Sequence, residues 1–308
     1  MRTRHIGSLE VSVIGLGCNN FGGRIDAARS AQVVAAALDA GITFFDTADI
    51  YGGTKSEEFL GQALGSHRDD VVVATKFGMK VDEERRGARP DYVVRALEDS
   101  LRRLGTDRVD LYILHAPDPD TPIADTLAAL NTCVEEGKVR EIGCSNFSAT
   151  QIRQAEEATA PGAAGFVSVQ NEYSLLQREP EREVLAECQR AGLAFVPYFP
   201  LASGLLTGKY RKGEPPPAGA RLSGMPAEHY AALDDRLSIA AELRSLAENR
   251  GHTLLDLAFS WLLDHAVVAS VIAGATTADQ VRTNAAAGSF ELDDETRAAI
   301  DTLSPPPA

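Results

Sequence analysis

The chain has 308 residues, 44% of them hydrophobic, and a formal net charge of −14 from 44 acidic and 30 basic residues. Because such an acidic surface repels the phosphates of nucleic acids, no nucleic-acid partner is expected. The four cysteines include no CxxC pair and no zinc-like spacing, which predicts no metal site and fits a reducing cytosol. The charged N-terminal segment and the lack of an apolar run of about 20 residues predict a cytoplasmic protein without a membrane span.

Short apolar runs rich in β-branched residues alternate along the chain with longer amphipathic segments. Near-continuous apolar runs are typical of parallel strands buried on both faces. The predicted strands are residues 11–14, 43–46, 71–75, 109–114, 141–144, 167–170, 194–198 and 270–273. The predicted helices are residues 30–39, 91–104, a segment starting at Pro122, 149–158, 180–191, 253–264, 277–287 and 293–303.

This alternation predicts a parallel α/β sheet, and eight strands in one chain of this length favour a closed (β/α)8 TIM barrel. A doubly wound open sheet is the alternative. A single domain spanning residues 1–308 is expected, with an extra C-terminal helix and a disordered tail at 304–308. Residues 208–238, which follow the seventh strand, contain a Pro-Pro-Pro run and several glycines, and they predict a long excursion.

Polar or special residues stand where each predicted strand from the second onward ends. All such ends lie on one face of a (β/α)8 barrel, which is the face that carries active sites. Lone charges after apolar strands are costly unless they pair, so their repetition favours a functional site. The residues at these ends are Asp46, Lys76, His115, Ser145 with Asn146, Gln170 with Asn171, Tyr198 and Gly274.

These residue types suit the reduction of a carbonyl group. Asp46 stabilises the charge of Lys76, and Tyr51, five residues after Asp46, can reach the same barrel mouth. An adjacent ammonium favours the phenolate and lowers the pKa of a tyrosine, which makes Tyr51 a candidate general acid. His115 can orient the carbonyl oxygen. Because no side chain donates hydride, a nicotinamide cofactor is required.

With these residues placed, the chain closely resembles the aldo-keto reductase superfamily, as a bacterial-type NADPH-dependent member. The match runs from about Arg4 to Asn284. Residues 45–52 (FDTADIYG), Thr75-Lys76 and Leu114-His115 correspond to its catalytic segments. The resemblance implies Tyr51 as proton donor, tuned by Lys76 and Asp46, with His115 orienting a small carbonyl substrate.

The resemblance also implies residues that hold NADP(H), with NAD(H) as the other possibility. Ser145, Asn146 and Gln170 would bind the carboxamide, and Tyr198 would stack on the nicotinamide. Residues 200–206 would wrap the pyrophosphate, and residues 274–284 would hold the adenosine end on a helix N-terminus. The cofactor set is Gly17, Asp46, Ser145, Asn146, Gln170, Tyr198, Pro200, Leu201, Ser203, Gly204, Leu206, Gly274, Thr276, Thr277, Gln280 and Asn284. The substrate pocket set is Asn20, Phe21, Tyr51, Phe77, Met79 and His115.

The chain departs from the family pattern in two ways. Phe199 stands where the family often has serine after the stacking tyrosine. No basic residue occupies the positions of Gly274, Thr277 and Gln280, where many NADPH-dependent members carry Lys or Arg, and Arg282 would point elsewhere on its helix. Hydroxyl groups and the helix N-terminus would then have to hold the 2′-phosphate.

Two other motifs resemble known functional patterns but are not expected to act as such. The segment 15–20 (GLGCNN) starts like a dinucleotide-binding fingerprint but has Asn20 where the third glycine belongs. Tyr51 and Lys55 match the Tyr-x-x-x-Lys pattern of short-chain dehydrogenases, but two glycines between them disfavour the helix that this pair requires.

Three functions are compatible with the residues. The first is a carbonyl reductase. The second is an NADPH-binding auxiliary subunit of the same fold with little turnover, which can keep all four catalytic residues. The third, an aldolase or isomerase with Lys76 as a Schiff base, is disfavoured. The physiological substrate and the oligomeric state stay open.

Overall fold

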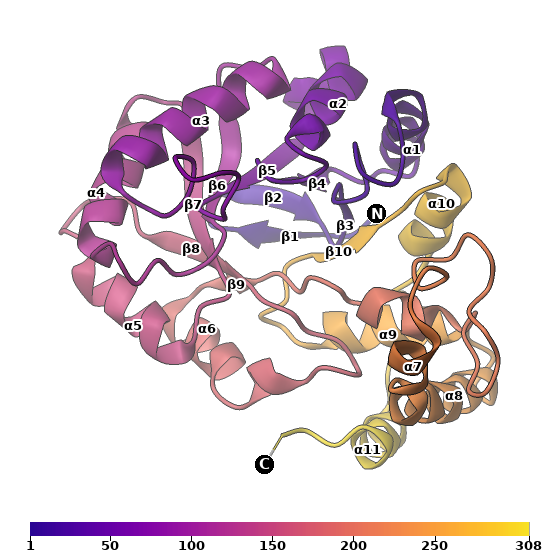
Figure 1. Cartoon of the computed structure of the whole chain (residues 1–308). Coiled ribbons are helices and arrows are strands. Elements are labelled where there is room, and N and C mark those ends of the chain that lie inside the picture. Colours follow the sequence, from indigo (N-terminus) through magenta and orange to yellow (C-terminus); the bar gives the residue numbers. More distant parts are fainter. Residues whose placement is uncertain (308) are drawn as a thin grey trace.

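The computed structural model describes residues 1–307 and shows eight parallel strands curled into a barrel, with helices around the outside (Figure 1). The strands pair in the order β10-β3-β4-β5-β6-β7-β8-β9. The Phe195 N–H donates to the Val267 carbonyl, and the Ala269 N–H donates to the Phe195 carbonyl, so that β9 is joined to the segment that leads into β10. The predicted (β/α)8 TIM barrel is therefore confirmed. Its strands are β3 (Ile14–Gly17), β4 (Phe44–Asp46), β5 (Val72–Phe77), β6 (Val109–Leu114), β7 (Val139–Ser145), β8 (Phe166–Gln170), β9 (Ala194–Phe195) and β10 (Val271–Gly274).

The helices follow amphipathic stripes between recognisable caps. In α3, Pro90 occupies the first turn, buried residues recur every three or four positions, and Gly105 ends the helix in the left-handed conformation. Ser148 caps α5 by accepting a hydrogen bond from the Gln151 N–H. The helices are α1 (Ala27–Asp39), α2 (Lys55–Leu64), α3 (Pro90–Leu104), α4 (Ile123–Glu135), α5 (Ala149–Ala158), α6 (Val184–Ala191), α7 (Ala227–Ala231), α8 (Asp234–Glu248), α9 (Leu254–Asp264), α10 (Ala278–Ala286) and α11 (Asp294–Leu303).

Helices α2, α7 and α8 were absent from the sequence-based prediction. A glycine inside α2 weakens its helical signal, yet Gly61 lets α2 approach α3 closely. A Cβ atom at Gly61 would lie 2.1 Å from the carbonyl oxygen of Leu104. The tertiary contact therefore explains a residue that is unfavourable for the isolated helix.

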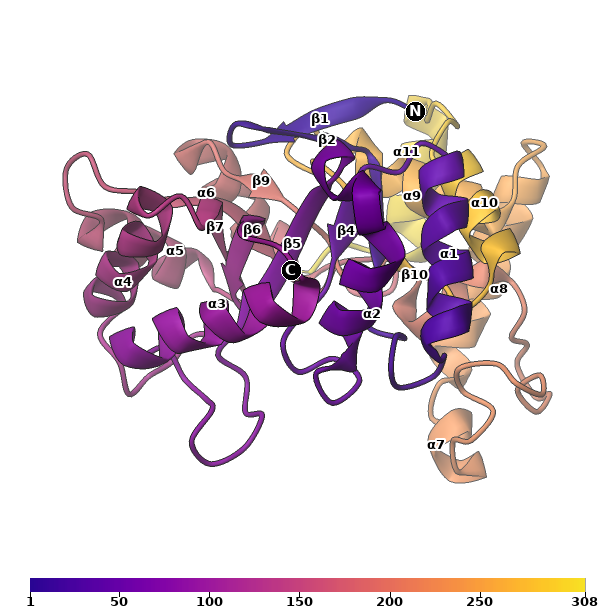
Figure 2. The ribbon, with the colours of Figure 1, turned by 90° about the horizontal axis from the view of Figure 1, so that it is seen from above.

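The predicted first strand, residues 11–14, was placed wrongly. Strands β1 (Thr3–Ile6) and β2 (Leu9–Ser12) form an antiparallel hairpin, and the first barrel strand begins only at Ile14. The hairpin lies across one end of the barrel, opposite the end near α7 (Figure 2). Ile6, Leu9 and Val11 are buried against residues of the barrel interior, so the hairpin closes that end. The prediction failed because the largely apolar residues 11–14 cross from the end of β2 into the start of β3, and they therefore resemble one continuous strand.

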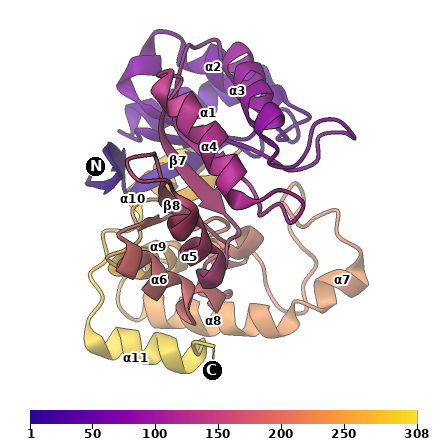
Figure 3. The ribbon, with the colours of Figure 1, turned by 90° about the vertical axis from the view of Figure 1, so that its left-hand side faces the viewer.

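The excursion at residues 208–238 is ordered rather than structureless. It contains α7 and the start of α8, and Tyr210, Leu222 and Tyr230 are buried within it. Figure 3 shows α7 and α8 on the same side of the molecule, with α11 beside α8. The expected disordered tail is anchored at its first residue, because the Ser304 hydroxyl donates to the Leu175 carbonyl and Arg178 donates to the Ser304 carbonyl. Ala308 lies outside the described residues.

Candidate active site

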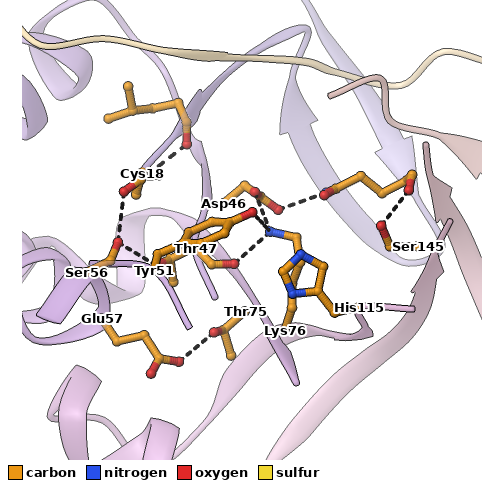
Figure 4. A network of polar contacts seen from close by, with 12 residues as sticks. Cys18, Asp46, Thr47, Tyr51, Ser56, Glu57, Thr75, Lys76, His115 and Ser145 are labelled. Atoms are coloured by element: carbon orange, nitrogen blue, oxygen red, sulfur yellow. Dashed lines mark hydrogen bonds and ion pairs between the residues drawn. The ribbon is translucent and has the colours of Figure 1, made fainter. Parts of the chain in front are cut away.

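The four predicted catalytic side chains meet at the carboxyl end of the barrel (Figure 4). Asp46 ends β4, Lys76 lies near the end of β5, His115 follows β6, and Tyr51 comes from the loop after β4. The Lys76 ammonium donates to Asp46 Oδ1 at 2.6 Å, to the Thr47 carbonyl at 2.8 Å and to the Tyr51 hydroxyl at 3.4 Å. The phenol oxygen of Tyr51 and the ammonium of Lys76 therefore point to the same place.

Lys76 and Asp46 form a buried ion pair, with 0% and 2% of their surfaces exposed. Burial alone would lower the pKa of Lys76, but Asp46 and Tyr51 outweigh it, so that this pKa is raised and the side chain stays an ammonium. The second carboxylate oxygen of Asp46 accepts a hydrogen bond of 2.9 Å from Gln170. Such extra hydrogen bonds are what a desolvated ion pair needs to persist.

The pKa of Tyr51 differs from the sequence-based expectation. Burial raises it, Lys76 lowers it in part, and Asp46 raises it again, so the net direction is upward. The phenol is therefore fully protonated at neutral pH. The ammonium lies 4.9 Å from the centre of the Tyr51 ring and still stabilises a phenolate when one forms.

His115 is an uncharged imidazole in this site. Burial, together with the positive charge of Lys76, lowers its pKa to about 3. Its ring packs edge-on against the Tyr51 ring at 5.8 Å, and Asn146 donates a hydrogen bond of 2.9 Å to its carbonyl. A neutral imidazole can donate one hydrogen bond to a carbonyl oxygen without competing for the proton of Tyr51.

We expect the imidazole signals of His115 in NMR spectra to show no titration between about pH 5 and about pH 8. Because the folded pKa lies below that of the unfolded chain, the stability that neutral His115 contributes is present above about pH 6.5 and is lost as the pH falls toward 3. A His115→Gln variant should therefore lose less stability than the native protein on acidification. A full titration of His115 near pH 6.5 would contradict this.

A cavity of about 740 Å³ adjoins the cluster of Asp46, Tyr51, Lys76 and His115, the four side chains that are called the tetrad below. Most of the predicted cofactor and substrate residues line this cavity. Near the tetrad, Tyr198 donates a hydrogen bond of 2.8 Å to Asn146 Oδ1, and the carboxamide of Gln170 is tied to Asp46. The predicted residues on the cavity wall are Gly17, Asn20, Asp46, Tyr51, Met79, His115, Asn146, Gln170, Tyr198, Pro200, Leu201, Ser203, Gly204, Gly274, Thr276, Gln280 and Asn284.

Two predicted substrate-pocket residues lie elsewhere. Phe21 and Phe77 have no exposed surface, and Phe77 stacks on Tyr112 at 4.6 Å in the layer between the barrel and its helices. Alternation along β5 explains the position of Phe77, because Lys76 faces the barrel interior and its neighbour Phe77 must face outward. Phe21 and Phe77 are therefore removed from the predicted substrate pocket.

Three predicted cofactor residues are behind the cavity wall. The Leu206 side chain is fully buried in the core. Ser145 is buried and donates to the Gln170 carbonyl at 2.6 Å, which supports the chain next to the Gln170 side chain. Thr277 caps α10 by accepting a hydrogen bond from the Gln280 N–H. Leu206 is thereby removed from the direct set, while Ser145 and Thr277 hold neighbours in place.

The loop after β9 has an unusual backbone. Phe199, Ala202 and Ser203 all have positive φ values, of 51°, 46° and 59°. This conformation costs an L-residue roughly 1–2 kcal/mol, and such strain clusters at ligand-binding sites. Because Phe199, Ser203 and Gly204 also line the cavity, this loop is a candidate ligand-binding element.

Sequence reasoning missed a group of cations and one aromatic ring on the cavity. Arg24, Lys209 and Arg221 all line it. Partial burial and the charge of Arg24 lower the pKa values of both Lys209 and Arg221. The guanidinium of Arg221 lies over the Phe199 ring at 5.1 Å. Phe199 therefore does more than replace the serine of the family pattern, because its ring supports Arg221. Of these cations, Arg24 could have been predicted from the sequence. Had the first barrel strand been placed at residues 14–17, the loop that follows it and contains Arg24 would have been expected at the barrel mouth.

No helix within residues 1–307 has the length and apolar character to cross a membrane, and no cluster of three metal-ligating side chains occurs there.

Comparisons with known proteins agree with this geometry. The profile of the Aldo/keto reductase family matches residues 13–305. A probable voltage-gated potassium channel subunit beta of Oryza sativa subsp. japonica is 36% identical over 92% of this chain and 90% of its own length. A protein of the same description from Arabidopsis thaliana is 34% identical with the same coverage. The uncharacterized oxidoreductase YrpG of Bacillus subtilis (strain 168) is 34% identical over 97% of this chain and 94% of its own length.

Proposed function

Because this chain belongs to the aldo/keto reductase family, we propose that it reduces aldehyde or ketone carbonyls to alcohols with NADPH. The observation that carries this proposal is the contact of the Lys76 ammonium with both Asp46 and the Tyr51 hydroxyl beside a large cavity. NADP(H) supplies the hydride that no side chain provides.

The residues of the site divide the remaining work. Neutral His115 and the Tyr51 hydroxyl donate hydrogen bonds to the substrate oxygen and hold the carbonyl in place. Tyr51 transfers its proton to the oxygen as negative charge develops there, and Lys76 stabilises the resulting phenolate. Asp46 keeps Lys76 charged and directed at the phenol. The buried setting strengthens each of these interactions.

The cofactor would lie along the cavity. Asn146 and Gln170 offer amide groups to the nicotinamide carboxamide, and Tyr198 offers a ring face. The strained loop from Phe199 to Gly204 would wrap the pyrophosphate, and the N-terminus of α10 would face the adenosine end. Asn20 and Met79 are left near the mouth for the substrate.

The cations on the cavity address the apparent lack of a 2′-phosphate site. A pyrophosphate carries two negative charges, whereas Arg24, Lys209 and Arg221 provide three positive ones. The Asp279 carboxylate also lines the cavity, but it is paired with Arg282. A further phosphate would therefore find a counter-charge, which favours NADPH over NADH.

We expect NADPH to bind with a dissociation constant at least about 10-fold below that of NADH. Lys209→Gln and Arg221→Gln should each weaken NADPH binding by roughly 10-fold, because each removes a charge-assisted hydrogen bond. Lys212→Gln is the matched control, since Lys212 lies on the same excursion but bonds to Ser238 instead of lining the cavity. Titrations followed by NADPH fluorescence measure these constants. Equal constants for the two nucleotides would refute the NADP(H) assignment.

A second function is favoured by the two plant relatives, whose descriptions name potassium channel beta subunits. A protein of that type would bind NADPH in this cavity and act as an auxiliary subunit with little turnover. The tetrad alone does not separate the two functions.

NADPH oxidation with a panel of aromatic and short aliphatic aldehydes decides between them. Turnover that is well above background and is abolished in Tyr51→Phe supports the reductase. Tight NADPH binding with no turnover on any carbonyl supports the auxiliary subunit. A borohydride-trapped adduct on Lys76 would instead point to Schiff-base chemistry. Cytoplasmic location and a small-molecule partner stay predictions.

A further inference from the structure

A second buried carboxylate, Asp49, lies behind the tetrad and has no role in the reaction described above. It belongs to the loop that connects Asp46 to Tyr51, and only 3% of its surface is exposed. Its backbone N–H donates a hydrogen bond of 3.1 Å to the Lys76 carbonyl. The residue is thus attached to both the catalytic lysine and the loop that carries the catalytic phenol.

Asp49 forms no ion pair within residues 1–307, because the nearby cations are paired with other carboxylates. Lys76 is paired with Asp46. Arg103 is paired at 2.6 Å with Glu57, another fully buried carboxylate, which also accepts a hydrogen bond from Thr75. Asp49 Oδ1 is buried and has no hydrogen-bond partner among the described residues. An unpaired buried carboxylate is costly, so it tends to hold its proton.

The groups that face Asp49 come from every neighbouring element. Glu57 is on α2, Lys76 on β5, Arg103 and Tyr92 on α3, and Tyr112 on β6. Burial and then the charge of Glu57 raise the pKa of Asp49 to about 7, against the effects of Arg103, the Ile50 N–H and Lys76. Burial and then Asp49 raise the pKa values of Tyr92 and Tyr112, so both remain phenols.

A small void of about 10 Å³ adjoins Asp49 and has room for at most one water molecule. Its outer part is lined by Arg85 and Asp99, which are partly exposed and paired with Asp82 and Arg102. None of the residues that line this void lines the cofactor cavity, so Asp49 faces a space separate from that cavity.

From this geometry we infer that Asp49 is a positioning residue whose charge, acting through Lys76, sets how the rate of carbonyl reduction depends on pH. The inference rests on the proposed function. While Asp49 is neutral, the Lys76 ammonium acts fully on the Tyr51 phenolate. Once Asp49 is ionised, its negative charge offsets part of that effect, and Tyr51 becomes a weaker acid.

The native enzyme should therefore lose activity as the pH rises through about 7, by roughly 3- to 10-fold, as expected for one added negative charge that acts on the Lys76 ammonium. Asp49→Asn keeps the shape of the neutral acid and cannot ionise. Its kcat/KM should match that of the native enzyme at about pH 5.5 and exceed it by the same roughly 3- to 10-fold at about pH 8. Asp99→Asn is the matched control, because Asp99 lines the same void but is paired with Arg102, and its profile should stay native.

Thermal unfolding gives a readout that needs no turnover. The folded pKa of Asp49 lies above the unfolded value, so its stabilising contribution is present at low pH and is lost as the pH rises to about 7. The melting temperature of Asp49→Asn, relative to the native protein, should therefore increase between about pH 5 and about pH 8. If the Asp49→Asn variant does not fold, the same measurements are made on Asp49→Ser, which likewise cannot ionise.

The outcomes separate this inference from the proposed function. Turnover with identical pH profiles in the native enzyme and Asp49→Asn overturns the role of Asp49 and leaves the reductase intact. If no carbonyl is reduced, the proposed function fails, and the role of Asp49 in it fails with it. In that case, a melting-temperature difference between Asp49→Asn and the native protein that rises with pH still shows that Asp49 ionises near neutrality. A difference that does not change with pH shows that Asp49 does not ionise there.

Discussion

The Tyr51→Phe variant should reduce carbonyls more slowly than the native protein by a factor of about 10² or more. The substitution removes the hydroxyl that accepts a hydrogen bond from the Lys76 ammonium at 3.4 Å, and it leaves the ring in place. Because the phenol acts on the substrate oxygen, the dissociation constant of NADPH should stay within about two-fold of the native value. Steady-state NADPH oxidation and fluorescence titration measure the two quantities.

Tyr112→Phe is the matched control for this variant. Its hydroxyl is also buried, but it donates to the Val93 carbonyl at 3.3 Å, in the layer outside the barrel. Its loss should cost about 1 kcal/mol of stability and leave turnover unchanged. Near-native turnover in Tyr51→Phe would remove Tyr51 from the role of acid, and an equal loss in both variants would indicate a structural effect.

The Lys76→Met variant should lose both stability and turnover. Met fills the space of the lysine stem but leaves the Asp46 carboxylate buried without its cation, which should cost about 3–5 kcal/mol. Turnover should fall by a factor of about 10² or more, because the phenolate of Tyr51 loses its stabilising charge. Urea unfolding and NADPH oxidation measure the two effects.

The Asp46→Asn/Lys76→Met double variant separates these effects. With no charge left in the pair, about 2 kcal/mol or more of the lost stability should return, since buried ion pairs are often replaceable by neutral groups. Turnover should remain as low as in Lys76→Met. Recovery of turnover together with stability would mean that Lys76 only supports the fold.

Some of the site could be predicted because strand periodicity and strand ends are local properties. The apolar runs before Asp46, Lys76 and His115 place all three at one end of a parallel barrel, whatever the surrounding packing. The substrate residues were less predictable. Phe77 follows Lys76 directly and therefore faces the opposite side of its strand, a consequence of register that becomes visible only once the inward-facing neighbour is known.

The sequence by itself determined the eightfold alternation of strands and helices, the identity of the polar residues at the barrel mouth and the family resemblance. Only the tertiary structure decided that the N-terminal hairpin closes one barrel end, that Lys209 and Arg221 of the excursion reach the cavity, and that Asp49 is left unpaired behind Lys76. The physical reason is the range of the interactions. Periodicity and capping act within one element, whereas burial and electrostatic pairing depend on groups tens to hundreds of residues apart in the chain.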